Sequence, residues 1–196
     1  MTLILASTSA SRARILKAAG IAFEAVAPAV DEEAVKAGLR AEGLAPREQA
    51  DALAEVKALS VSRRRAGLVI GADQMLSLGD QAFDKASDRA AARATLAALS
   101  GKTHVLHSAV ALARDGAVIW RHIETPKLTM RVLSDAFIES YLDAIGEAAF
   151  QSVGAYQLEG YGAHLFARVE GDFFSVLGLP LLPLLAILRE HGALTP

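Results

Sequence analysis

The chain has 196 residues, 53% of them hydrophobic, which is enough for a sizeable core and short for two independent domains. The formal net charge of −2, from 20 basic and 22 acidic residues, argues against a surface that coats nucleic acid polymers. With no cysteine in the chain, disulfides, thiolate catalysis and zinc–thiolate sites are excluded. No apolar run is long enough to span a membrane, and no basic-then-apolar leader comes first, so we expect a cytoplasmic protein that binds no membrane.

The chain opens with the pattern of a short strand, a hydroxyl-rich loop and a helix. The apolar run 3–5 is typical of a covered strand, Ser9 can cap the helix that follows, and Gly20 ends it. Backbone N–H groups, the positive end of the helix dipole, the Ser7 hydroxyl and Arg12 then face one point, which favours an anion site. The alternative is that the hydroxyls only cap the helix and that Arg12 is solvated.

An acidic pair and a lysine are the next candidates. Asp31 can cap a helix that has Glu32 in its first turn, and the same acids can also bind a metal ion. A longer helix is expected over 46–65, with Lys57 on its apolar row. A lysine at the edge of a core commonly extends its ammonium to solvent, whereas one aimed inward near an anion loop suits phosphate recognition. Both interpretations of Lys57 stay open at this point.

A second covered strand is expected over 68–70, and it delivers Asp73 at its carboxyl end. Carboxyl ends of such strands are where α/β proteins bind their ligands. The chain then continues as another strand over 75–78, and a two-residue turn at 79–80 leads it back to Lys85. We expect Lys85 to return toward the strand that carries Asp73.

Residues 100–103, Ser-Gly-Lys-Thr, look like the end of a phosphate-binding P-loop. That motif needs a glycine where Leu96 stands and a strand before the loop, and neither is present. We therefore disfavour a P-loop kinase. Gly101 is expected to end a helix that Ser87 or Asp88 begins.

The remaining pattern predicts further strands, helices and one glycine-rich loop. They are a hairpin of strands 105–113 and 117–132, a helix from Ser134 to Gly146, the loop 153–162, strands 165–169 and 173–176, and a final helix opened by Pro180. The glycine-rich loop either permits tight backbone packing or forms a wall of a base pocket. His104 and His107 fall on opposite faces of an extended strand, so they are a poor metal pair.

The order Leu-Ala-Ser-x-Ser-x-x-Arg in residues 5–12 resembles the opening signature of the Maf family of nucleoside triphosphate pyrophosphatases. Similar motifs recur at 71–73, 99–102, 154–156 and 178–181, in the family's order over essentially the whole chain. The resemblance implies one α/β domain over residues 1–196, with a long, mixed, twisted sheet, flanking helices and a cleft between two lobes. It also implies hydrolysis of a nucleoside triphosphate to a nucleoside monophosphate and pyrophosphate.

Site residues follow from the same resemblance, position by position. Those that match the family's substrate-binding residues are Ser7, Ser9, Arg12, Lys57 and Lys85. Asp73 matches the catalytic aspartate, and with Glu32 it matches the proposed ligands of a divalent cation, Mg²⁺ or Mn²⁺, which prefer oxygen donors. The chain departs from the family pattern at Val56, Ala86, Gln151 and Ser152.

Three further positions, Ser11, Gln74 and Glu159, match those at which subgroups of the family differ. Members that act on 7-methyl-GTP have Trp, Gln and Glu there, and members that act on dTTP and UTP have Arg, Thr and Gln. The chain agrees with the first group at two positions, so we expect 7-methyl-GTP or another purine nucleotide as substrate. A dTTP or UTP pyrophosphatase and a non-catalytic nucleotide-binding module are the alternatives, and a homodimer stays open.

Overall fold

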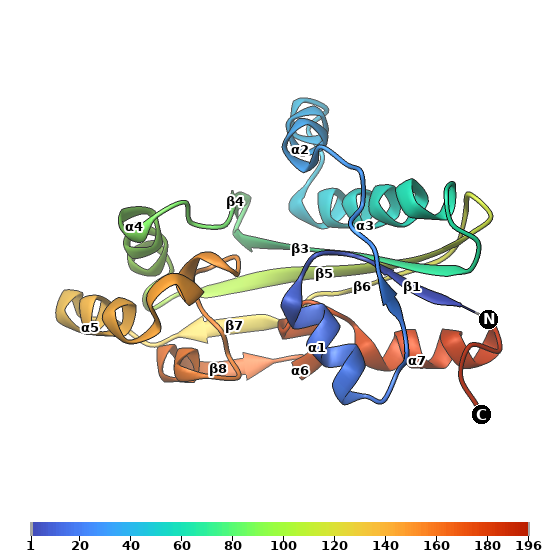
Figure 1. Cartoon of the computed structure of the whole chain (residues 1–196). Helices are drawn as coiled ribbons and strands as arrows, with labels where there is room; N and C mark the ends of the chain where they lie inside the picture. Colours follow the sequence, from blue (N-terminus) through green and yellow to red (C-terminus); the bar gives the residue numbers. More distant parts are fainter. Residues whose placement is uncertain (1, 196) are drawn as a thin grey trace. The chain divides into compact units, whose positions relative to one another are not determined.

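The computed structural model describes residues 2–195. The strands are β1 (Leu3–Ala6), β2 (Glu24–Ala25), β3 (Leu68–Leu78), β4 (Gln81–Phe83), β5 (Thr103–Arg114), β6 (Ala117–Glu124), β7 (Lys127–Met130) and β8 (Phe166–Glu170). The α-helices are α1 (Ala10–Ala18), α2 (Glu32–Ala41), α3 (Pro46–Ser62), α4 (Arg89–Leu99), α5 (Asp135–Ile145), α6 (Phe173–Val176) and α7 (Leu181–Glu190). Two 3-10 helices, η1 (Gly146–Phe150) and η2 (Tyr161–Leu165), complete the secondary structure (Figure 1).

The eight strands form a mixed sheet in the order β2-β1-β3-β5-β7-β8, with β4 paired to β3 and β6 paired to β5. The fold therefore belongs to the α/β class with a long mixed sheet, as the sequence predicts. The chain divides into two compact units. The first unit comprises Met1–Gln74, Ser108–Glu124 and Asp172–Pro196, and the second comprises Met75–His107 and Thr125–Gly171. The expectation of a single domain stays a prediction beside this division.

The first unit is built around the parallel pair β1 and β3, whose side chains alternate between two covered faces. On one face Leu3 and Leu5 pack with apolar side chains of α1 and α7, including Leu16 and Leu184. On the other face Ile4 and Val69 pack with Val61 of α3. Figure 1 shows α3 on one side of these strands and α1 and α7 on the other. Burial on both faces explains why the two strands read as unbroken apolar runs.

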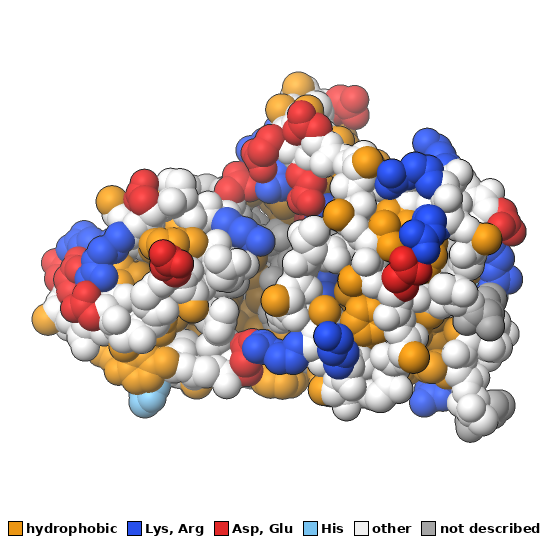
Figure 2. Space-filling model, viewed as in Figure 1, with side chains coloured by type: hydrophobic (Ala, Val, Ile, Leu, Met, Phe, Trp, Pro, Cys, Tyr) orange, Lys and Arg blue, Asp and Glu red, His pale blue; other side chains and the backbone are white. Residues whose placement is uncertain are grey.

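The second unit contains the antiparallel strands β7 and β8 and the helix pair α4 and α5. An exposed ion-pair network joins the two helices, in which Arg89 and Arg93 each contact Glu139 of α5 at 2.7 and 2.8 Å. Figure 2 shows basic and acidic side chains intermixed on the surface over α4 and α5, at the left of the view. No helix in the described part of the chain is both long and apolar enough to cross a membrane.

Local sequence signals give most helix starts correctly. Ser9, Asp88 and Ser134 each accept a hydrogen bond from a backbone N–H in the first turn of α1, α4 and α5, as expected of cap residues. Asp31 does the same for α2. Gly20 has a φ of 71° just beyond α1, the left-handed conformation that ends a helix.

Several predicted strands are wrong in extent or type. Residues 173–176, expected as a returning strand, form α6, because Asp172 caps them by accepting from the Ser175 N–H at 2.7 Å. The expected strand 117–132 is divided into β6 and β7, with Pro126 between them. Conversely, the two strands expected on either side of Asp73 are one continuous strand, β3.

Candidate active site

The loop between β1 and α1 is organised by its own hydroxyl groups. Ser7 Oγ accepts hydrogen bonds from the Ser9 N–H at 3.1 Å and from Arg12 Nη1 at 3.4 Å. Ser9 Oγ in turn accepts from the Arg12 N–H at 3.4 Å and caps the helix. Because Ser7 uses its acceptor positions within the loop, its hydroxyl proton is the part of the group that can be donated to a ligand oxygen. The loop thus pairs a hydroxyl donor with a guanidinium at the positive end of α1.

Arg12 is held in this loop almost without solvent contact, at 9% exposure. Its Nε donates to the Gly178 carbonyl at 2.9 Å, which fixes the plane of the guanidinium. Burial lowers the pKa of Arg12 from its ordinary value, while the negative charges of Asp73 and Glu32 act in the opposite direction. An arginine with these surroundings is not the solvated side chain of the alternative interpretation.

A lysine between two carboxylates forms the second part of the site. Lys57 Nζ of α3 lies 2.7 Å from Asp73 Oδ1 of β3 and 2.8 Å from Glu32 Oε2, at the start of α2. The side chains of Lys57 and Asp73 are only 6% and 9% exposed, whereas that of Glu32 is 42% exposed. The structure therefore supports the inward orientation of Lys57, and it brings both acidic metal candidates to one ammonium group.

Close packing of α3 on β3 makes this contact possible. A Cβ at Gly71 would overlap the Ala54 carbonyl and lie 2.6 Å from the Ala58 N, so only glycine lets the strand meet the helix backbone. The parallel pairing of β1 with β3 ends at Ala6 and Gly71, two residues before Asp73. Asp73 thus lies within β3 but just past the end of β1, where the loop that contains Ser7 and Ser9 begins.

The charges of these groups cancel. Arg12 and Lys57 are cationic, Glu32 and Asp73 are anionic, and each of the two cations interacts with both carboxylates in the first unit. A polyphosphate brings several negative charges, which this neutral set of two cations and two carboxylates does not compensate.

Glu32 and Asp73 fit a magnesium-type ion by the chemistry of their donors. Within residues 2–195 no group of three or more His, Asp or Glu side chains could hold a metal. Mg²⁺, however, is commonly bound by one or two carboxylates, with waters and substrate phosphates as its other ligands. Two carboxylate oxygens that converge on one cationic nitrogen match that arrangement.

Two of the specificity candidates contact the same backbone segment instead of an open pocket. Ser11 Oγ donates to the Leu177 carbonyl at 3.0 Å. Gln74 Nε2 lies within 3.1 Å of Ser108 Oγ and of the carbonyls of Ser175 and Val176. Ser108 and Ser175, both fully buried, are missed by the sequence reasoning. A lone serine at the start of the apolar run 109–113 is the signal that could have drawn attention to Ser108.

The other two candidates lie in the second unit. Lys85 is exposed, follows the last paired residue of β4 by two positions and forms an isolated antiparallel bridge with Val153. Glu159 is exposed in the glycine-rich loop. The expected return of Lys85 toward the strand that carries Asp73, and the roles of both residues, stay predictions.

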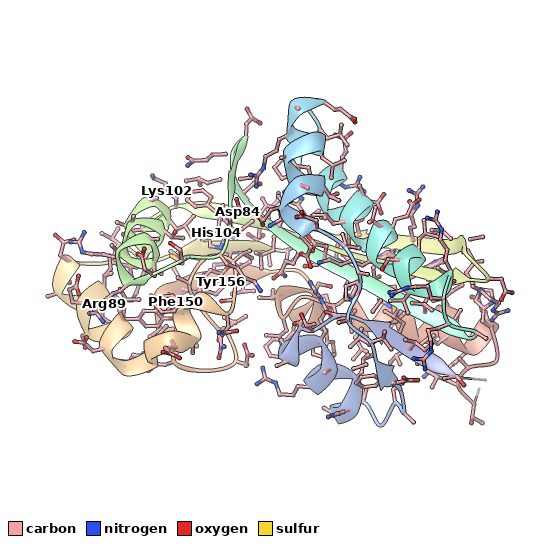
Figure 3. All side chains as sticks on the ribbon, turned by 45° about the horizontal axis from the view of Figure 1, so that its top comes forward. Asp84, Arg89, Lys102, His104, Phe150 and Tyr156 are labelled. Atoms are coloured by element: carbon pink, nitrogen blue, oxygen red, sulfur yellow. The ribbon has the colours of Figure 1, made fainter. Side chains whose placement is uncertain are left out.

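A buried polar cluster of the second unit also escaped sequence reasoning. His104 Nε2 lies 2.7 Å from Tyr156 Oη, and Tyr141 Oη donates to the Ala155 carbonyl at 3.2 Å. Burial lowers the pKa of His104 to about 4 and raises the pKa values of both tyrosines, so all three side chains are neutral at pH 7. Figure 3 shows His104 and Tyr156 side by side in the interior of this unit.

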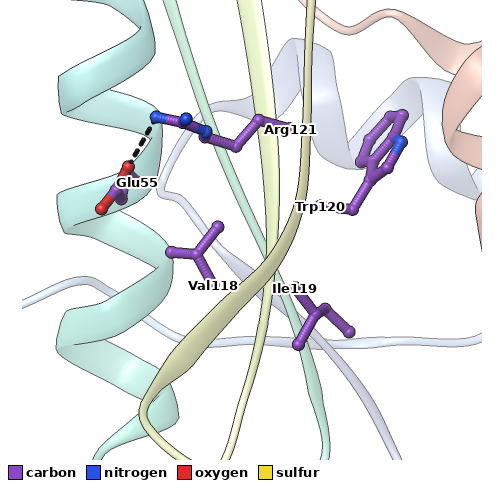
Figure 4. Close-up of a pocket in the computed structure, with 5 residues that line it drawn as sticks. All are labelled: Glu55, Val118, Ile119, Trp120 and Arg121. Atoms are coloured by element: carbon purple, nitrogen blue, oxygen red, sulfur yellow. Dashed lines mark hydrogen bonds and ion pairs between the residues drawn. The ribbon is translucent and has the colours of Figure 1, made fainter.

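The surface of the first unit has a pocket of about 340 Å³, lined by Glu55, Val118, Ile119, Trp120 and Arg121. Arg121 Nη1 contacts Glu55 Oε2 at 3.1 Å across it (Figure 4). Glu55 and Lys57 are two positions apart on α3 and so point about 200° apart around the helix. The pocket therefore contains none of the groups of the lysine–carboxylate centre.

Fold and site together define an α/β protein with a hydroxyl-rich loop that holds a buried arginine, and with a buried lysine–carboxylate centre. The chain belongs to the Maf-like protein family, whose model matches residues 2–191. It is 58% identical over 194 residues to a nucleoside triphosphate pyrophosphatase of Hyphomonas neptunium, covering 99% of this chain and 98% of the relative. It is 52% identical over 193 residues to a 7-methyl-GTP pyrophosphatase of Rhizobium meliloti, covering 98% of this chain and 97% of the relative. The family predicted from the sequence motifs is thereby confirmed.

Proposed function

We propose that this chain is a nucleoside triphosphate pyrophosphatase, which hydrolyses its substrate to a nucleoside monophosphate and pyrophosphate. The observation that carries the proposal is the contact of Lys57 with both Asp73 and Glu32 beside the Arg12 loop. The names of relatives at 52 to 58% identity over nearly the whole chain support the same activity. Nucleoside triphosphates are cytoplasmic metabolites, so the proposed substrate also favours a cytoplasmic enzyme.

In this proposal the cationic groups bind the triphosphate. Arg12 offers a planar guanidinium whose Nε donates to the Gly178 carbonyl and whose Nη1 donates to Ser7 Oγ, and its other terminal N–H groups are proposed to donate to the anion. Ser7 and Ser9 add hydroxyl donors at the N-terminus of α1, and Lys57 adds a point charge. Lys85, which the family pattern assigns to the triphosphate, is proposed to contribute a further positive charge.

Asp73 is the proposed proton acceptor. Lys57 occupies its Oδ1 and stabilises the carboxylate, which leaves Oδ2 to take a proton from water. The water oxygen forms a bond to the α-phosphorus, the bond from that phosphorus to the bridging oxygen breaks, and pyrophosphate leaves. The cations that bind the triphosphate stabilise the charge that develops on the leaving pyrophosphate.

We further propose that Glu32 and Asp73 bind a divalent cation, Mg²⁺ or Mn²⁺, together with substrate phosphates. Such an ion supplies charge neutralisation and polarises phosphoryl oxygens. The neutral balance of Arg12, Lys57, Glu32 and Asp73 supports it, because these residues alone do not compensate the charge of a triphosphate.

Product analysis tests the activity and the metal requirement together. The purified protein is incubated with nucleoside triphosphates, with Mg²⁺ or with a chelator, and the products are followed by phosphorus NMR. We expect monophosphate and pyrophosphate with metal and no turnover with chelator. Release of orthophosphate as the first product contradicts the pyrophosphatase, and full activity in chelator contradicts the metal. Binding of nucleotides without turnover identifies a binding module.

For the base, we propose a preference for 7-methyl-GTP or another purine nucleotide over dTTP and UTP. Glu159 supports it, since a carboxylate accepts hydrogen bonds from the N1–H and exocyclic amine of guanine and attracts a cationic methylated ring. Catalytic efficiencies on these substrates, for the wild type and for Glu159→Gln, are the test. We expect the preference in the wild type and its erosion in the variant, and a clear dTTP or UTP preference in the wild type contradicts the proposal.

A further inference from the structure

Four consecutive backbone carbonyls, those of residues 175–178, accept hydrogen bonds from side chains far away in the sequence. The contacts are Ser108 Oγ to Ser175 O at 2.6 Å, Gln74 Nε2 to Ser175 O and Val176 O at 3.0 and 3.1 Å, Ser11 Oγ to Leu177 O at 3.0 Å, and Arg12 Nε to Gly178 O at 2.9 Å. The last carbonyls of a helix have no partners within it and ordinarily bind water. Here the end of α6 is fastened by four side chains.

The contacts settle what Gln74 can offer to a ligand. Its amide nitrogen faces two carbonyl oxygens, which can only accept hydrogen bonds. This atom must therefore be the donor, and the opposite, flipped orientation of the side-chain amide is excluded. Both of its N–H groups are therefore used within the protein. Only its Oε1 remains, and it lies on the side of Gly178, 3.7 Å from where a Cβ of that residue would be.

Ser108 connects the Gln74 side chain to the carbonyl of Ser175. It is fully buried, donates to the Ser175 carbonyl and accepts from Gln74 Nε2 at 2.8 Å. Removing its hydroxyl deletes both of these hydrogen bonds, so that the Ser175 carbonyl and Gln74 Nε2 are held only by their remaining contacts.

Gly178 connects the segment to Arg12. Its φ of 101° is open to glycine alone, and this conformation turns its carbonyl toward Arg12 Nε. A Cβ at this residue would also lie 3.9 Å from Arg12 Nε and Nη2. The position of residues 175–178 therefore sets the orientation of the guanidinium.

We propose that Ser108 and Gln74 are positioning residues that act through the segment 175–178 to orient Arg12 for the polyphosphate of the substrate. The proposal rests on the proposed function, in which Arg12 binds the triphosphate. It assigns Gln74 a role that does not depend on the base, since both N–H groups of its amide are used within the protein. Its consequence is that disturbing this segment weakens binding of the polyphosphate whichever base the nucleotide carries.

Inorganic tripolyphosphate separates this role from contact with a base, because it has no base. Its affinity is measured by calorimetry in Mg²⁺ on the full chain and on Ser108→Ala. Loss of one buried hydrogen bond predicts about five- to tenfold weaker binding. KM is expected to rise by a similar factor for every nucleotide, with kcat nearly unchanged. Ser62→Ala is the matched control, since this buried hydroxyl accepts from the Gly116 N–H away from the segment and is expected to leave the affinity unchanged.

A double-mutant cycle excludes a general loss of structure. Lysine has no Nε–H to donate to the Gly178 carbonyl, so Ser108→Ala is expected to have little further effect in an Arg12→Lys background. Equal effects in both backgrounds, unchanged tripolyphosphate affinity in Ser108→Ala, or no binding by the wild type overturn the inference. Should Ser108→Ala not fold, Gln74→Met serves in its place. If tripolyphosphate binding follows these expectations but no nucleotide is hydrolysed, the proposed function is refuted. The inference about Ser108 and Gln74 then still holds.

Discussion

The two units each bury a small polar centre, and the two centres are stabilised in opposite ways. In the first unit, Lys57 and Asp73 are buried as charges and compensate one another at 2.7 Å. In the second, His104 Nε2 and Tyr156 Oη lie 2.7 Å apart, and burial keeps both side chains neutral. Burial shifts a pKa toward the neutral form unless an opposite charge lies close by. An ion pair thus holds the first centre together, and hydrogen bonds between neutral groups hold the second.

This difference separates a centre suited to a charged ligand from one suited to holding a loop. In the proposed function, the charged centre exchanges its internal ion pairs for contacts with phosphate and a cation. The neutral centre has no charge to offer, but its hydrogen bonds fasten Tyr156 and Ala155, and Ala155 has a strained φ of 58°. The predictions below test this contrast, from the largest expected effect to the smallest.

Lys57→Met is expected to lower the free energy of unfolding by about 3 to 5 kcal/mol in metal-free buffer, because Asp73 is left as an uncompensated buried charge. Adding Asp73→Asn to this variant should recover part of the loss, since it removes that charge. Denaturant unfolding of the single and double variants measures both effects, with exposed Lys102→Met as the control. An unchanged unfolding midpoint in Lys57→Met shows that the charged centre is not internally compensated.

Asp73→Asn is expected to lower kcat by about a hundredfold or more, since the amide cannot take a proton from water. Side-chain volume hardly changes, so the fold and binding of tripolyphosphate should be largely retained. Steady-state pyrophosphate release gives the rate, and Asp143→Asn, a surface partner of Arg89, is the control. A near-wild-type rate in Asp73→Asn removes this residue from the chemistry.

The neutral centre predicts a loss of stability in mild acid. The folded state keeps His104 neutral down to a pKa of about 4, whereas the unfolded chain takes up its proton near 6.5. The contribution of His104 to the free energy of unfolding is therefore fully present above about pH 6.5 and is lost as the pH falls toward 4. Between pH 7 and pH 5 the wild type should lose about 2 kcal/mol more than His104→Gln. Denaturant unfolding at both pH values measures the difference, and exposed His164→Gln should behave like the wild type.

The exposed network of α4 and α5 sharpens the contrast, since its charges are compensated but not buried. Hydrogen bonding to Arg89 lowers the pKa of Glu139, yet surface ion pairs contribute little because water and salt screen them. Glu139→Gln should hardly change the thermal midpoint, and the small effect should vanish in about 1 M salt. Calorimetry at low and high salt measures it. A loss comparable to that of Lys57→Met means that burial is not the deciding variable.

Features that depend on residues close together in the sequence could be predicted, whereas features that depend on contacts between distant residues could not. The cap at Ser9 and the apolar row that contains Lys57 are local patterns, and both are present in the structure. The hydrogen bonds to the carbonyls of residues 175–178 include one from Gln74 to a carbonyl 101 positions away, and no sequence spacing predicts such a contact. The α6 helix was mistaken for a strand, because Phe-Phe-Ser-Val has strand propensity and the cap at Asp172 decides its conformation.

The glycine contact between β3 and α3 has a consequence for how tolerant the site is to change. Main-chain atoms of Ala54 and Ala58 face Gly71, so the spacing between strand and helix is set by backbones, which are the stiffest parts of a protein. Neighbouring core side chains can therefore be exchanged for others of similar volume without altering the distance between the backbones of Lys57 and Asp73. At Gly71 itself even a methyl group forces the two elements apart. Efforts to stabilise this protein by filling its core should therefore leave this line of contact unchanged.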